Sequence, residues 1–192
     1  MGSWSGRTLP GIILIHASVR IDFSMFQYCI KCAAPLSEYQ EDGFLRYRCG
    51  SCGWIYYNNP RPCIAAVIKR NRELLFIRRL KPPGQGLWDF PGGFMEIGED
   101  PETTLRREVR EELGAEIVQH ELLGIFPDFY DQERIPLLVF AFLCQAVFHD
   151  SGQFCSDEFD VMSWFAPEQF PVNPAFASMK PMMDAFRSKL AS

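Results

Sequence analysis

Three glutamates that could hold a divalent cation lie within a span of five residues. Glu108, Glu111 and Glu112 belong to a polar segment that begins at Asp100. On a helix their side chains fall within an arc of roughly 100°, and carboxylates crowded in this way repel one another. Ligands that offer only oxygen suit Mg²⁺ or Mn²⁺, which keep part of their water shell and bridge to substrate phosphates. The spacing therefore indicates a metal site for phosphate chemistry.

Two neighbouring residues should complete this polar face. Arg107 lies on the same side of the predicted helix, so we expect it to make a bidentate contact with Glu99 and close the preceding loop. Thr104 stands one turn before Glu108 on the same face. We expect its small side chain to leave room for a phosphate.

Local signals define the helix that carries these residues. Asp100 is a suitable N-cap, and Pro101 suits the first helical position. Gly114 is suited to end the helix after Leu113. An apolar stripe beside the glutamates would anchor the helix to a sheet, and it consists of Leu105, Val109 and Leu113.

The remaining elements follow from apolar runs and their periodicity. Strands are predicted over residues 64–68, 74–77, 94–96, 118–126, 137–147 and 162–165. A second helix is predicted over residues 175–190, with one apolar stripe that fits core packing. Strands mixed with two helices of this length predict a layered α/β or α+β domain.

Four cysteines have the spacing of a zinc site. Cys29 and Cys32 form one CxxC pair, and Cys49 and Cys52 form another after sixteen residues. Each tight turn supplies two thiolates from one side, and two turns complete the tetrahedron that Zn²⁺ prefers. We expect a zinc ribbon with a turn at residues 41–43. The other three cysteines lack such spacing, and two of them lie in apolar runs as core residues: Cys63, Cys144 and Cys155.

Composition restricts the class of protein. The chain has 192 residues with a net charge of −5, which disfavours a strongly basic nucleic-acid binder. Apolar runs are all shorter than the ~18 residues of a membrane span, so we expect no membrane partner. Seven cysteines fit a fully paired secreted framework poorly. Together with a zinc site they favour a reducing compartment such as the cytoplasm.

Three segments are expected along the chain. Residues 1–24 are predicted to be a disordered extension, because Pro10 interrupts their short apolar run. Residues 25–60 form the zinc ribbon, whose folding needs the metal because so small a segment buries little core. Residues 61–192 form the larger domain. The ribbon has aromatic residues and a balanced charge, which favours a scaffold or homodimerisation role over nucleic-acid binding.

The glutamate segment as a whole resembles the Nudix box, G-x5-E-x7-R-E-U-x-E-E-x-G-U, where U is a bulky aliphatic residue. Val109 fills the first U, and Ala115 replaces the second, which affects packing rather than chemistry. The seven fixed positions are all present: Gly93, Glu99, Arg107, Glu108, Glu111, Glu112 and Gly114. The chain therefore resembles a Nudix hydrolase over residues ~61–190.

The resemblance implies a fold and a set of roles. The fold would be an α/β/α sandwich with a mixed sheet. Glu108 and Glu112 would be the principal metal ligands, and Glu111 a further ligand or a water-orienting group. The Gly92 carbonyl would complete the metal shell, and the Glu99–Arg107 pair would be structural. Glu111 and Glu158 are both candidates for the general base.

The reaction implied is hydrolysis of a nucleoside diphosphate linked to another moiety. A zinc ribbon before this domain resembles the NADH pyrophosphatase group. That group carries a further domain before the ribbon and a specificity segment that residues 126–136 do not reproduce, so NADH, ADP-ribose and FAD all stay open. Phe129 and Tyr130 could stack on a nucleobase or pack in the core. The alternatives are a nucleotide-binding regulator that does not cleave and an RNA-end enzyme.

Overall fold

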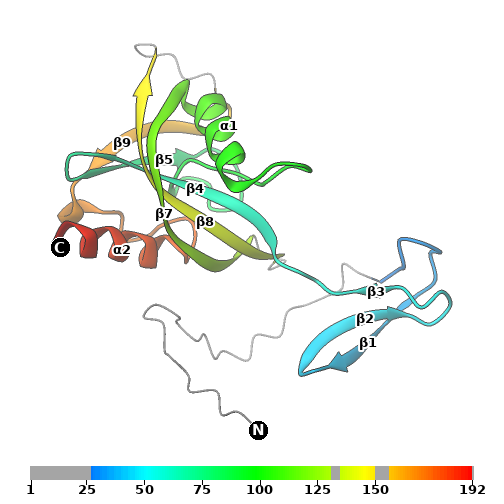
Figure 1. Cartoon of the computed structure of the whole chain (residues 1–192). Coiled ribbons are helices and arrows are strands. Elements are labelled where there is room, and N and C mark those ends of the chain that lie inside the picture. Colours follow the sequence, from blue (N-terminus) through cyan, green and yellow to red (C-terminus); the bar gives the residue numbers. More distant parts are fainter. Residues whose placement is uncertain (1–26, 131–134, 150–155, 192) are drawn as a thin grey trace, which may run out of the picture.

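The computed structural model describes residues 27–130, 135–149 and 156–191. The predicted N-terminal extension and Cys155 lie outside these residues. The described strands form two sheets, one of three strands and one of six. Figure 1 shows the smaller sheet set apart from the larger one, with the start of a long strand leading from one to the other.

The smaller sheet is an antiparallel meander. Strand β1 (Leu36–Glu41) pairs with β2 (Phe44–Cys49), and β2 pairs with the short β3 (Ile55–Tyr56). Asp42 and Gly43 connect β1 to β2 with φ angles of 52° and 82°. The left-handed conformation at both positions suits a tight hairpin, as the predicted turn requires.

The larger sheet is mixed and has the order β6-β5-β4-β8-β7, with β9 paired to β5. Strands β4 and β8 are parallel, and the other named pairs are antiparallel. Its strands are β4 (Arg61–Arg70), β5 (Glu73–Arg79), β6 (Trp88–Asp89), β7 (Ala115–Tyr130), β8 (Ile135–Phe148) and β9 (Phe159–Phe165).

A helix covers each face of this sheet. Helix α1 (Pro101–Leu113) lies on one face and α2 (Met179–Ala191) on the other (Figure 1). Side chains alternate along a strand, so β4 contributes to two cores. Ile64, Ala66 and Ile68 belong to the core under α1, whereas Cys63, Ala65 and Val67 belong to the core under α2. The predicted α/β/α sandwich with a mixed sheet is confirmed.

Several boundaries differ from the sequence prediction. Strands β4, β7 and β8 are longer than predicted, and the strand expected over residues 94–96 is only an isolated bridge between Phe94 and Cys63. The second helix begins at Met179 instead of residue 175. Tertiary contacts fix this start, because Ala175 donates its N–H to the Trp88 carbonyl and Ser178 donates its N–H to the Asp128 carboxylate.

Among the described residues, none of the helices is long and apolar enough to cross a membrane. Cys63 and Cys144 are buried in the two cores, as their apolar surroundings predict. The division of the chain at residue 60 stays a prediction, although the two sheets meet in sequence at this point.

Candidate active site

Helix α1 is fixed at both ends and along one side. The Asp100 carboxylate accepts a hydrogen bond of 2.7 Å from the Thr103 N–H, and Gly114 ends the helix with a φ of 59°. Leu105 and Val109 are fully buried against the sheet. These are the caps and the stripe that the sequence predicts. They hold the opposite side of the helix, which carries the glutamates, in one orientation.

The three glutamates differ sharply in exposure. Glu112 is buried, with a relative exposure of 6%. The Glu108 side chain is 13% exposed, and the Glu111 side chain is 60% exposed. The carboxylates therefore form a series that runs from the protein interior to solvent. This arrangement could hold a cation at the inner end and present it to a substrate at the outer end.

Two consecutive glycines let the backbone approach this series. The Gly92 N–H donates to Glu112 Oε2 at 3.0 Å. A Cβ at Gly93 would collide with the Glu108 carboxylate, and a Cβ at Gly92 would collide with the Ile64 carbonyl. Gly92 also has a φ of 149°, which favours glycine. The missing side chain at Gly93 lets the loop approach helix α1, and the missing side chain at Gly92 lets it approach strand β4.

Arg107 connects the loop to two of the glutamates. Its guanidinium makes two hydrogen bonds to the Glu99 carboxylate, Nε to Oε1 at 2.7 Å and Nη2 to Oε2 at 2.9 Å, which confirms the predicted bidentate pair. Nη1 also donates to Glu108 Oε1 at 2.8 Å and to Glu111 Oε2 at 3.1 Å, and Nη2 donates to the Phe94 carbonyl. These further contacts were not predicted.

Thr104 has a different role from the one predicted. Thr104 is fully buried, and its hydroxyl donates a hydrogen bond to Glu99 Oε2 at 2.8 Å. The expectation that Thr104 leaves room for a phosphate is therefore wrong. Its small side chain instead allows the loop carboxylate to pack against the helix. The hydrogen bonds from the Arg107 side chain, from Glu96 and from Thr104 lower the pKa of Glu99 to about 2.

The electrostatics of the inner glutamates favour a cation. Burial, and then the charge of Glu108, raises the pKa of Glu112 to about 9. Burial also raises the pKa of Glu108. The charge of Glu158, an exposed residue before β9, adds to both shifts, so this carboxylate lies within electrostatic range. Two neighbouring buried carboxyl groups are hard to ionise at the same time unless a positive charge offsets them. A divalent metal bound to their oxygens would supply that charge.

A pocket of about 90 Å³ opens beside Gly92 and Gly93. Its wall includes a set of rings in contact: Tyr130 lies 5.3 Å from Phe94 and 6.1 Å from Phe176 between ring centroids, and the second pair is stacked. Phe129, the other predicted stacking residue, is not among the residues that line this pocket.

The pocket also contains an ion pair. Arg79 Nη1 lies 2.8 Å from Asp89 Oδ2, and both side chains are largely buried. The guanidinium lies over the Phe176 ring at 5.2 Å from its centroid. Burial raises the pKa of Asp89 to about 6, against the lowering effect of Arg79. This pair was not predicted from the sequence, because its residues belong to β5 and β6 and no local motif links them.

The NUDIX domain family profile matches residues 59–186, which include the glutamate helix, the two glycines and the whole pocket lining. The chain belongs to the NUDIX family. The predicted resemblance is thereby confirmed over two thirds of the sequence.

Several curated relatives carry the same name. The NAD-capped RNA hydrolase NudC of Yersinia pestis (strain Pestoides F) is 29% identical over 198 residues, covering 91% of this chain and 73% of that protein. NudC of Chromobacterium violaceum is 34% identical over 101 residues, covering 53% of this chain and 37% of that protein. NudC of Pasteurella multocida is 26% identical and has 56% of its length aligned. This chain therefore spans only part of its curated relatives.

Solved NUDIX structures agree with the fold. A NUDIX hydrolase from Nitrosomonas europaea superposes with a TM-score of 0.63 at 22% identity, covering 86% of this chain and 93% of that one. The MutT NUDIX hydrolase from Burkholderia pseudomallei superposes with a TM-score of 0.58 at 26% identity, covering 65% of this chain and 96% of that one.

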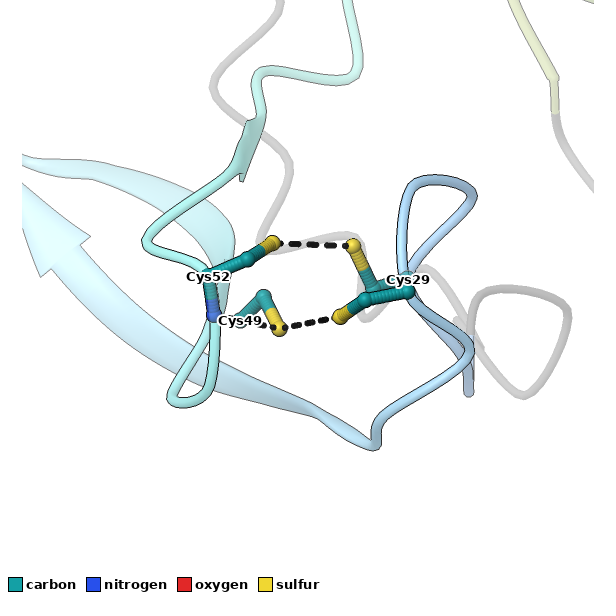
Figure 2. A group of neighbouring side chains, drawn as sticks. Cys29, Cys49 and Cys52 are labelled. Carbon is teal, nitrogen blue, oxygen red and sulfur yellow. Dashed lines mark hydrogen bonds between the residues drawn. The ribbon is translucent and has the colours of Figure 1, made fainter.

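The four predicted cysteines also come together, in the segment before the NUDIX profile begins. Their sulfur atoms all lie within 4.8 Å of one another. Cys29 Sγ is 3.6 Å from Cys52 Sγ, and Cys32 Sγ is 3.5 Å from Cys49 Sγ, so each turn faces the other (Figure 2). A hydrogen bond from the Cys52 N–H lowers the pKa of Cys49 to about 6. Four convergent sulfurs fit a tetrahedral metal such as Zn²⁺.

Proposed function

We propose that this chain is a metal-dependent pyrophosphohydrolase that cleaves the diphosphate of a nucleoside diphosphate linked to another moiety. The observation that carries the proposal is the graded series of Glu112, Glu108 and Glu111 beside the Gly92–Gly93 turn. A buried cluster of like charges costs stability unless a cation or a proton offsets it. A site that serves only structure would gain nothing from such a cluster.

Each residue of the series has a proposed role. Glu108 and Glu112 would hold Mg²⁺ or Mn²⁺ together with the Gly92 carbonyl. When bound, the metal would neutralise phosphate oxygens and lower the pKa of a water molecule. Glu111 reaches solvent and would orient or deprotonate that water, and Glu158 is the alternative base. Arg107 would position Glu108 and Glu111 through its hydrogen bonds.

The pocket would receive the planar ring of the substrate. Tyr130, Phe94 and Phe176 offer ring faces, and Asp89 and Asp128 offer acceptors for ring N–H groups. The pocket borders the glycine turn, so a ring bound there would have its attached phosphates near the glutamates. NAD, ADP-ribose and FAD conjugates all satisfy this requirement, and the NudC relatives are named for NAD-capped RNA.

The test is a panel of conjugates assayed with Mg²⁺ or Mn²⁺: NADH, ADP-ribose, FAD and NAD-capped RNA. We expect cleavage of at least one member into two monophosphate products, identified by mass spectrometry. A nucleoside triphosphate would serve as the control for cleavage that is not specific to conjugates. Tight binding of a conjugate without cleavage would contradict the proposal and favour a nucleotide-binding regulator.

We also propose that the four cysteines bind one structural Zn²⁺. Elemental analysis of protein purified in metal-free buffer should find about one zinc per chain. Four free thiols and no zinc would contradict this assignment.

A further inference from the structure

We propose that one face of the three-stranded sheet binds single-stranded nucleic acid by base stacking and phosphate contacts. Side chains alternate along strands, and the pairing of Tyr39 with Arg46 places both on this face. Phe44 and Arg48 follow at alternate positions of β2. We call this surface the aromatic–arginine face, and it consists of Tyr39, Phe44, Arg46, Arg48 and Tyr57.

Arg46 holds two exposed rings in place. Its guanidinium lies 5.2 Å from the centroid of the Phe44 ring and 5.2 Å from that of Tyr57. Its Nη1 also donates to the Tyr57 carbonyl at 3.0 Å, which fixes the segment after β3 against β2. Phe44 is nevertheless 61% exposed and Tyr57 45% exposed. Rings that are held yet exposed can stack on bases with little further loss of conformational freedom.

The charge of the segment is divided unevenly between the two faces of the sheet. Arg46 and Arg48 lie on the aromatic–arginine face, where Glu41 is the acidic residue contributed by the strands. Glu38 belongs to the opposite face, where it accepts a hydrogen bond from the Tyr47 hydroxyl. A balanced composition therefore conceals a face that combines guanidinium groups with aromatic rings. This combination is typical of surfaces that bind single strands without reading sequence.

Two polar atoms on this face have no hydrogen-bond partner among the described residues. They are Tyr39 Oη and Arg46 Nε, and both are buried. Both atoms are inaccessible to a ligand while Arg46 holds the rings, so the inference rests on the exposed rings and the guanidinium groups.

The aromatic–arginine face lies close to the proposed active site along the chain. Cys63 stands six positions after Tyr57, and it lines the pocket beside the glycine turn. An extended chain of this length spans at most ~21 Å. A short oligonucleotide could therefore reach both, although the inference itself rests only on the face.

The test uses the zinc-loaded full chain and fluorescence anisotropy in buffer without Mg²⁺. The probe is a labelled single-stranded RNA of about ten nucleotides with a plain 5′ hydroxyl. It carries no pyrophosphate bond, so its binding is independent of the proposed hydrolysis. We expect Phe44→Ala and Tyr57→Ala each to weaken binding by about five- to hundredfold, which is the usual effect of losing a stacking ring.

Matched variants distinguish stacking from loss of structure. Phe44→Tyr keeps a ring and should keep the affinity. Leu122→Ala removes an exposed apolar side chain of β7, outside the three-stranded sheet, and should have no effect. Arg48→Gln should reduce the dependence of log affinity on log salt by about 0.7. Zinc content and circular dichroism check that each variant is folded.

Three outcomes would overturn the inference. The wild-type chain could fail to bind the RNA, the Phe44→Ala/Tyr57→Ala double variant could bind as tightly as wild type, or a duplex could bind as well as the single strand. Comparable binding of single-stranded DNA supports the inference, because stacking and phosphate contacts do not require a 2′-hydroxyl.

Discussion

The two ligand clusters of this chain are organised in opposite ways. The glutamate series lies on a helix anchored by two fully buried apolar residues, and Arg107 already offsets part of its negative charge. The four cysteines lie on two turns of a small sheet, and their sulfurs face one another with no cationic side chain of the described residues hydrogen-bonded to them. We infer that the first cluster is built by the protein and can receive a metal, whereas the second would depend on its proposed Zn²⁺ for structure.

Zinc removal should give the largest difference between the two regions. Apparent binding free energies of structural zinc are about 10–16 kcal/mol, which exceeds what the small sheet can supply from burial. We expect a chelator to abolish amide-exchange protection in β1 and β2 while β4 and β8 stay protected. Persistent protection of β1 and β2 in zinc-free protein would show that the two regions do not differ in this way.

Loss of Arg107 should be the next largest effect, and it falls on the glutamate region. Arg107→Gln removes the partner of Glu99 and leaves Glu108 and Glu111 without their shared donor. The expected loss is about 2–4 kcal/mol in the free energy of unfolding, measured by urea denaturation of the zinc-loaded protein. Arg110→Gln changes an exposed arginine of the same helix and should cost less than about 0.5 kcal/mol. Equal effects of the two substitutions would argue against a central role for Arg107.

Thr104→Val is expected to have a smaller effect. The substitution keeps the shape of the side chain but removes the hydroxyl that donates to Glu99, at a cost of about 1–2 kcal/mol. Thr103→Ser is the control, because Thr103 is exposed and serine keeps both the backbone N–H and the hydroxyl that interact with Asp100. A stable Thr104→Val variant would mean that Arg107 alone holds the loop.

The pH dependence of stability should show the repulsion within the series. Burial raises the pKa of Glu112 from 4.5 to about 9, so the folded protein binds a proton that the unfolded chain releases. Its contribution to stability is complete below pH 4.5 and is lost as the pH rises toward about 9. Without Mg²⁺ or Mn²⁺, Glu112→Gln should therefore be more stable than wild type at high pH and should flatten this decline. If the free energy of unfolding changed with pH in the same way for both proteins, Glu112 would be excluded as the source of the decline.

Local signals predicted the glutamate region well, and tertiary contacts explain what they missed. Asp100, Pro101 and Gly114 define α1 at the predicted residues, because a cap acts within one turn. The start of α2 depends on Trp88 and Asp128, which are distant in sequence. The Arg79–Asp89 pair in the pocket likewise joins two strands. The paired CxxC spacing predicted the cysteine cluster, but charge composition could not show that Arg46 and Arg48 share a face.

Single-turnover cleavage with Mn²⁺ tests whether Glu112 is a ligand for the catalytic metal, as we propose. The substrate is the best conjugate of the panel at saturating concentration, and Glu102→Gln, an exposed glutamate of the same helix, is the control. We expect Glu112→Gln to reduce the rate by orders of magnitude while its apo form stays at least as stable as wild type. Equal single-turnover rates for wild type and Glu112→Gln would contradict the claim.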